Sequence, residues 1–124
     1  MMIAFVRERL RLPVGFSANA DRRYLLRREA IESIFVFYRI AGDEKLRDAV
    51  WKMFENIQSL ARTDIAYAAV EDVTDTNTTK ANKMESFWMT ETMKYFYLLY
   101  SEPSVINLDQ FVLNTEAHLL KRQQ

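Results

Sequence analysis

The stretch MESFWMTETMKYFYLLYS, residues 84–101, decides the fold of this chain. Apolar side chains recur in it with the 3.6-residue period of an α-helix, which predicts a helix from about Met84 to Tyr100. Pro103 and Asn107 follow and are expected to close it. This helix is apolar over most of its circumference, so without partner elements it would expose much apolar surface, a patch expected to drive association.

Two further helices are predicted upstream. One runs from about Arg28 to Ile40, with Gly42 as its C-terminal stop. The other runs roughly from Glu44 to Arg62 and carries a single apolar stripe formed by Leu46, Val50, Met53, Phe54, Ile57 and Leu60.

The remaining segments predict little regular structure. Residues 65–84 are polar and rich in Thr, Asn and Asp, which is typical of a long loop. The tail QFVLNTEAH, residues 110–118, alternates like a strand in its first half and predicts a short C-terminal β-hairpin. Residues 1–20 form an unassigned leader. The predicted fold class is therefore all-α, with no parallel sheet.

Composition excludes several functional classes. The 124 residues are enough for one domain, and seventeen acidic residues balance seventeen basic ones. No net field therefore attracts nucleic acid or an anionic membrane. The chain has no cysteine, so it has neither disulfides nor a thiolate metal site. No apolar run is long enough to predict a membrane segment.

Four acidic residues lie in aromatic-rich surroundings. Glu29 and Glu32 are three apart and share a helix face, Glu91 follows Phe87 by four residues, and Glu116 lies in the tail. A single helical glutamate normally faces solvent, and that reading stays open for each of them. Clustered carboxylates near aromatic rings suit either a hard cation with oxygen ligands or a sugar site with acid–base chemistry.

Three segments carry a resemblance to a known family. MESFWMTETMKYFYLLYS followed by VLNTEAH resembles the C-terminal region of glycoside hydrolase family 47, the class I α-1,2-mannosidases. LLRREAIESIFVFYRIAGD resembles the segment that precedes this region along the sequences of that family. The resemblance covers residues 21–122 and implies the C-terminal part of an (αα)7 barrel. Residues 21–124 would then form part of a catalytic domain whose upstream barrel helices are missing here.

The resemblance also implies an activity. Members are calcium-dependent inverting hydrolases that remove α-1,2-linked mannose from high-mannose N-glycans, in the endoplasmic reticulum, in the Golgi or after secretion. Thr115 matches the residue that binds Ca²⁺ through its hydroxyl and carbonyl oxygens, at the tip of the hairpin. His118 falls at the motif's histidine, and we expect a structural role for it because calcium prefers oxygen ligands.

Glu29 matches the carboxylate that acts as general base in the family. Of the other acids, Glu32, Glu91 and Glu116 match groups that bind the sugar or hold calcium-bound water. Phe87 matches the aromatic that packs against the mannose ring, and Arg27 matches an arginine that could pair with sugar hydroxyls or a neighbouring acid. The resemblance predicts that five residues converge on one concave face: Glu29, Glu32, Phe87, Glu91 and Thr115.

Two departures from the family pattern stand out. Arg28 replaces a proline directly before Glu29, which places a positive charge beside the predicted base. The charge would stabilise the carboxylate and weaken it as a base. Leu119 replaces a proline after His118, with less expected consequence.

Inverting hydrolysis also needs a carboxylic acid roughly 6.5–9.5 Å from the base. In the family it lies upstream, and residues 1–20 do not resemble its segment. The chain is therefore expected to be inactive alone. Two alternatives remain, a non-catalytic or weakly catalytic mannosidase-like protein of endoplasmic-reticulum glycoprotein disposal, and an unrelated helical interaction module. The ending Asn114-Thr115-Glu116-Ala117-His118 favours a processing or secreted mannosidase over the disposal proteins.

Overall fold

The structure is a computed structural model that describes residues 21–123, so the predicted leader lies outside the described residues. The described chain divides into two compact units. One contains residues 21–26 and 52–84, and the other contains residues 27–51 and 85–123. Each unit is described by itself.

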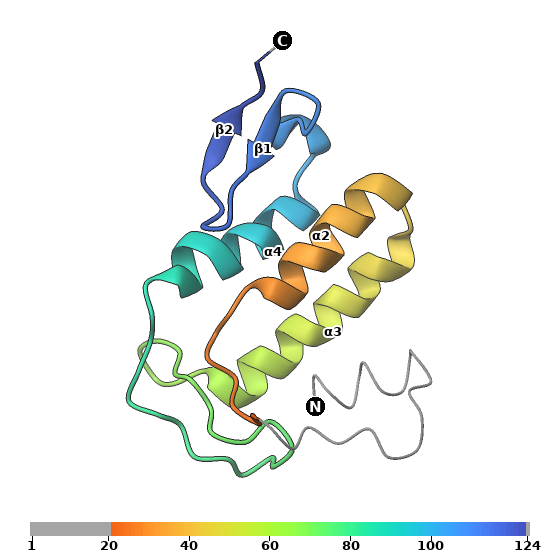
Figure 1. Ribbon diagram of the computed structural model, residues 1–124. Helices are drawn as coiled ribbons and strands as arrows, with labels where there is room; N and C mark the ends of the chain where they lie inside the picture. Colours follow the sequence, from red (N-terminus) through yellow and green to blue (C-terminus); the bar gives the residue numbers. More distant parts are fainter. Residues whose placement is uncertain (1–20, 124) are drawn as a thin grey trace. The chain divides into compact units, whose positions relative to one another are not determined.

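The described elements are mostly helical (Figure 1). In chain order they are α2 (Glu29–Ala41), α3 (Glu44–Ala61), the π-helix η1 (Trp88–Thr92), α4 (Met93–Tyr100), the 3₁₀-helix η2 (Pro103–Ile106), β1 (Phe111–Leu113) and β2 (Leu119–Lys121). Within residues 21–123 the two strands pair antiparallel and form the only sheet. The prediction of an all-α fold with a C-terminal hairpin is confirmed. The second strand, however, lies beyond the predicted 110–118.

The predicted stop of α2 is confirmed. Gly42 has a φ of 65°, the left-handed conformation that glycine adopts without a steric penalty. Its N–H donates a hydrogen bond to the Tyr38 carbonyl at 2.8 Å and so satisfies one of the last carbonyls of the helix. Both Glu29 and Glu32 lie in the first turn, where the helix dipole favours negative charge.

The predicted start of the third helix at Met84 is wrong. Helical structure begins at Phe87 and continues as η1 and α4. The Lys83 carbonyl accepts a hydrogen bond from the N–H of Ala69 at 3.0 Å, so this part of the chain is committed to a non-helical pairing. The first helical turn instead uses the Ser86 carbonyl, which accepts the N–H of Met89 at 3.2 Å.

The core of the second unit forms where α2 packs against α4 (Figure 1). The rings of Phe35 and Tyr95 lie 5.4 Å apart at an interplanar angle of 55°, a favourable tilted arrangement. The third helical segment buries Trp88, Thr92, Tyr95, Phe96, Leu98 and Leu99. Of the apolar surface it was expected to expose, Met89 and Tyr97 remain more than half exposed.

The first unit holds the polar segment that was predicted to be a loop. Residues 63–83 contain no helix or named strand, and isolated antiparallel bridges pair Tyr24 with Val70, Arg62 with Tyr67, and Val70 with Lys80. Val70 is buried. The apolar stripe on α3 is confirmed for its buried members Val50, Met53 and Ile57. Within residues 21–123 no helix has both the length and the apolar character needed to cross a bilayer.

Candidate functional site

A partly buried cluster of charges joins α2 to η1. The Arg28 guanidinium donates from Nε to Glu32 Oε2 at 3.1 Å, and its Nη1 donates to Glu91 Oε2. The side chain of Arg28 is only 18% exposed and that of Glu91 only 12%. Glu32 and Glu91 therefore lie close together, as predicted, with a cation between them.

The local backbone explains why Arg28 reaches this position. Arg28 occupies the N-cap of α2, where small residues with a side-chain oxygen are preferred because they accept helix N–H groups. Its side chain makes no capping hydrogen bond. Glu32 is one turn along the same helix, so the two side chains lie on one face at i and i+4.

Glu91 lies in the π-helical turn. Met93 donates its N–H to the Trp88 carbonyl, the i to i+5 pattern that defines this rare turn. Such turns occur often at functional sites. Glu91 is 9% exposed overall, and a carboxylate at this depth needs a partner, which Arg28 supplies.

Tyr95 completes the cluster. Its hydroxyl donates to Glu32 Oε1 at 3.2 Å, so both oxygens of Glu32 are engaged. Burial raises the pKa of Tyr95 above its ordinary value, and the negative charge and hydrogen bond of Glu32 raise it further. Burial lowers the pKa of Arg28, but the charges of Glu91 and Glu32 outweigh it and the net shift is upward.

Arg27 organises the exposed part of the site. Its Nη1 donates to Glu29 Oε1 at 3.4 Å, and its guanidinium carbon lies 6.0 Å from the centre of the Phe87 ring. Glu29 is 57% exposed, so water can reach it. The preceding Leu26 has a φ of 59°, a strained conformation for a bulky residue that costs about 1–3 kcal/mol. Arg27 thus contacts two other predicted site residues, Glu29 and Phe87.

This arrangement gives Arg28 two partners that the sequence did not predict. The sequence predicts that its charge acts on the neighbouring Glu29. In the structure its guanidinium is hydrogen-bonded to Glu32 and Glu91 instead, while Arg27 pairs with Glu29. The hydrogen bonds go to these two acids because successive residues at the start of a helix project in different directions. The charge of Glu29 also acts on Arg28, without a hydrogen bond.

The hairpin turn contains the other predicted site residues. Asn114 Oδ1 accepts the backbone N–H groups of Glu116 at 3.0 Å and of His118 at 2.8 Å. Lys94 of α4 donates to the Ala117 carbonyl at 2.8 Å and ties the turn to the helix. Thr115 lies in the exposed part of this turn, as the resemblance implies.

Thr115 is not joined to the acid cluster by direct bonds. Neither its hydroxyl nor its carbonyl oxygen is hydrogen-bonded to any residue in 21–123. Glu116 and His118 are 3.6 Å apart, Oε2 to Nδ1, and both are exposed. In the described part of the chain no three Asp, Glu or His side chains gather as a metal cluster.

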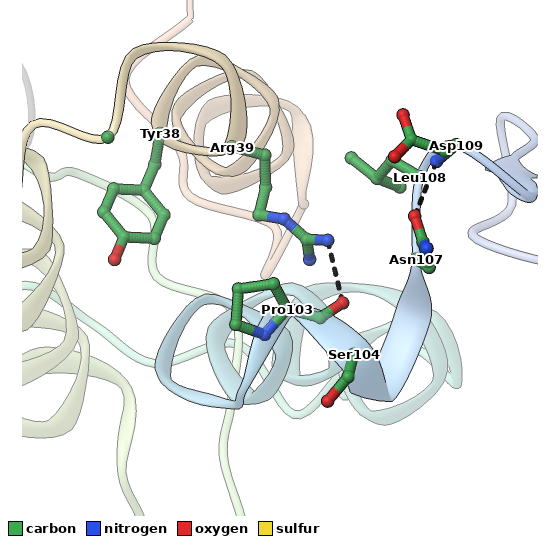
Figure 2. A pocket seen from close by; sticks show the side chains of 8 residues that line it. Tyr38, Arg39, Pro103, Ser104, Asn107, Leu108 and Asp109 are labelled. Atoms are coloured by element: carbon green, nitrogen blue, oxygen red, sulfur yellow. Dashed lines mark hydrogen bonds between the residues drawn. The ribbon is translucent and has the colours of Figure 1, made fainter.

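A separate cavity of about 510 Å³ lies at the end of α2 (Figure 2). Arg39 reaches into it and donates to the carbonyls of Pro103 at 3.0 Å and Ile106 at 2.8 Å. Asn107 accepts the backbone N–H of Asp109 at 2.9 Å on its far wall. None of the predicted site residues lines this cavity.

Sequence reasoning missed two members of the charge cluster. It treated Arg28 only as a departure and did not single out Tyr95. A signal was present for both, because Arg28 precedes Glu32 by four residues and Tyr95 follows Glu91 by four. Their meeting across two helices could not be predicted without knowing that α2 packs on α4.

This chain is similar to several known mannosidases. A mannosyl-oligosaccharide 1,2-alpha-mannosidase of Arabidopsis thaliana is 48% identical over 82% of this chain and 16% of its own length. The endoplasmic reticulum mannosyl-oligosaccharide 1,2-alpha-mannosidase of Homo sapiens is 41% identical over 82% of this chain and 15% of its own. The chain thus spans about one sixth of these relatives.

A solved structure agrees with them. The alpha-1,2-mannosidase from Trichoderma reesei matches with a TM-score of 0.79 and 36% identity, over 84% of this chain and 23% of that enzyme. The described helices therefore have the fold of part of an α/α barrel. The sequence profile of glycosyl hydrolase family 47 matches residues 8–122. This excludes the unrelated helical module, and the chain belongs to glycosyl hydrolase family 47.

Proposed function

We propose that the chain supplies the base-bearing, sugar-binding part of a catalytic domain that hydrolyses α-1,2-linked mannose in mannosyl-oligosaccharides. The observation that carries the proposal is the placement of Glu29. Its carboxylate is exposed at the start of α2 and paired with Arg27, whose guanidinium lies against the Phe87 ring. An inverting sugar site needs a carboxylate base on one side of the scissile bond, and here a hydrogen-bond donor and an aromatic ring lie beside that base.

In this mechanism Glu29 accepts a proton from the attacking water. The 3.4 Å contact with Arg27 orients the carboxylate, and its exposure leaves room for the water. Inversion requires a carboxylic acid on the opposite side of the bond, roughly 6.5–9.5 Å away. We assign that acid to the portion of the domain that the relatives have beyond the span of this chain.

The other residues bind the sugar. Phe87 offers an apolar ring face to the C–H groups of mannose, and Arg27 can donate to its hydroxyls. Glu91 keeps Oε1 without a hydrogen bond from residues 21–123, so this oxygen can accept from a sugar hydroxyl. Glu32 has both oxygens engaged and supports the site through Arg28 and Tyr95. Glu116 is exposed beside Thr115 and can accept from a hydroxyl or a water.

Thr115 fits a calcium ion. Its hydroxyl and carbonyl are hard oxygen donors, and both are without hydrogen bonds from the described residues. Bound there, Ca²⁺ would supply positive charge that orients sugar hydroxyls and water. The acids Glu32 and Glu91 fit less well as supports for its water shell, because Arg28 already neutralises part of their charge.

That last observation favours a second candidate. If Arg28 keeps Glu32 and Glu91 from the substrate, the domain binds mannose without turning it over, as in a non-catalytic mannosidase-like protein of glycoprotein disposal. For either candidate we propose a location in the secretory pathway. Similar proteins of Homo sapiens and Mus musculus are named as endoplasmic reticulum mannosidases.

The test joins residues 21–122 to the upstream part of a complete relative such as the Trichoderma reesei enzyme. The chimera should release mannose from α-1,2-linked mannobiose, and NMR should detect the β-anomer first. Retention of configuration would contradict the proposal. An inactive chimera that becomes active with Arg28→Pro would establish the second candidate.

A further inference from the structure

Arg28 is the one cation that contacts both Glu32 and Glu91 among the described residues. Its Nε and Nη1 donate to different carboxylates, so a single guanidinium bridges two helical segments, α2 and η1. Arg28 and Glu91 are less than one fifth exposed. The three groups together carry a net charge of −1, where the two acids alone would carry −2.

The desolvated setting strengthens this bridge. Charge-assisted hydrogen bonds in a region of reduced dielectric are stronger than those in water, and the planar guanidinium matches the geometry of carboxylates. Tyr95 holds the second oxygen of Glu32 at 3.2 Å, which fixes that carboxylate in position for Arg28. The bridge is therefore an ordered part of the fold rather than a mobile surface pair.

We propose that Arg28 is the resident cation of the Glu32–Glu91 pair and lowers the affinity of the domain for a divalent cation. A calcium ion that draws on these carboxylates, directly or through water, must either displace the guanidinium or bind beside it. Displacing the guanidinium costs free energy because Arg28 would be left without partners. Binding beside it costs free energy because the two positive charges repel each other. Arg28 acts here as a positioning residue that sets cation affinity, an inference that rests on the proposed calcium-dependent function.

The experiment measures calcium binding to the 124-residue chain by titration calorimetry with CaCl₂, without substrate. Arg28→Gln removes the charge and keeps a shorter polar side chain, so calcium should bind about tenfold more tightly or better than to the wild type. Arg28→Lys keeps the charge and should bind calcium as weakly as the wild type. Unfolding midpoints of all variants are measured alongside.

Three control variants isolate the cluster. Arg23→Gln makes the same change in net charge at a surface arginine paired with Asp21, and it should leave calcium affinity unchanged. Arg28→Gln combined with Glu91→Gln should lose the gained affinity, because one of the two carboxylates is then neutral. In the wild-type background, Glu91→Gln alone should not weaken calcium binding, because the Glu91 carboxylate is already paired with Arg28.

Equal affinity of the wild type and the Arg28→Gln variant would overturn the proposal, as would tenfold weaker binding by Glu91→Gln alone. The second measurement keeps the proposal testable if Arg28→Gln does not fold. These outcomes are separate from those of the proposed function. Mannose release by the chimera reports whether the site hydrolyses the sugar, whereas the titration reports only which cation the two acids hold.

Discussion

The hydroxyl of Tyr95 donates to Glu32 Oε1 at 3.2 Å, and this bond joins α4 to the first turn of α2 beneath the charge cluster. Tyr95 is 1% exposed, and its ring packs against Phe35. Tyr95 holds the Glu32 oxygen that Arg28 does not contact. This hydrogen bond therefore links the stability of the helix pair to the protonation of one tyrosine.

The free energy of unfolding should fall at alkaline pH because Tyr95 loses its proton. Burial, with the charge and hydrogen bond of Glu32, raises its pKa in the folded state. The contribution is fully present below the unfolded-state value of about 10 and is lost as pH rises toward the folded-state value. In urea unfolding, the wild type should lose more stability than Tyr95→Phe between pH 9 and pH 11. The matched change at the exposed Tyr97 should preserve the wild-type profile, and identical profiles for Tyr95→Phe and wild type would exclude this role.

Glu91→Gln should destabilise the chain more than Glu29→Gln. Glu91 is buried and bound by Arg28, so its loss should cost about 1–3 kcal/mol in the free energy of unfolding. Glu29 is exposed and its pair with Arg27 is longer, so its loss should cost less than about 1 kcal/mol. Urea unfolding of both variants measures the difference. Equal costs would show that the Arg28–Glu91 pair adds nothing beyond a surface contact.

Asn114→Ala should loosen the hairpin turn that presents Thr115. It removes the oxygen that accepts two backbone N–H groups, at a cost of about 1–2 kcal/mol. Asn114→Asp keeps an acceptor in the same place and should retain most of the stability. NMR of the turn amides would show faster hydrogen exchange at Glu116 and His118 in the alanine variant. Unchanged exchange there would contradict this role for Asn114.

The 124-residue chain by itself should not release mannose. It spans about one sixth of its relatives, and general acid catalysis, which the proposal assigns to their remaining portion, contributes about 10²–10⁴-fold. Incubation with α-1,2-linked mannobiose and detection of free mannose check this. Calcium-dependent release by the isolated chain would mean that these residues contain more of the site than proposed.

The sequence was informative where one local rule governs. The stop at Gly42 follows from a single glycine, and the helical periods predicted α2 and α3 within a residue or two. It failed at Met84, because the pairing of the Lys83 carbonyl with Ala69 is set by a contact fourteen residues away along the chain. Helical periodicity carries no information on such a contact.

Some contacts in the candidate site could be predicted from the sequence and others could not. The resemblance placed Glu32 and Glu91 together, and their shared contact with Arg28 confirms that they are close. The guanidinium of Arg28 is hydrogen-bonded to Glu32 and Glu91 and not to Glu29, because side-chain direction depends on the α2–α4 packing. The expected effect of its charge on Glu29 as a base stays a prediction. The convergence of Thr115 with these acids stays a prediction.

The central claim, that Glu29 is the base of an α-1,2-mannosidase site, is tested most directly by Glu29→Gln in the active chimera. The substitution keeps the size and exposure of the side chain but removes its ability to accept a proton. Turnover of α-1,2-linked mannobiose should fall by about 10²–10⁴-fold, while the inactive variant still binds the sugar. A turnover within a few-fold of the parent chimera would contradict the account.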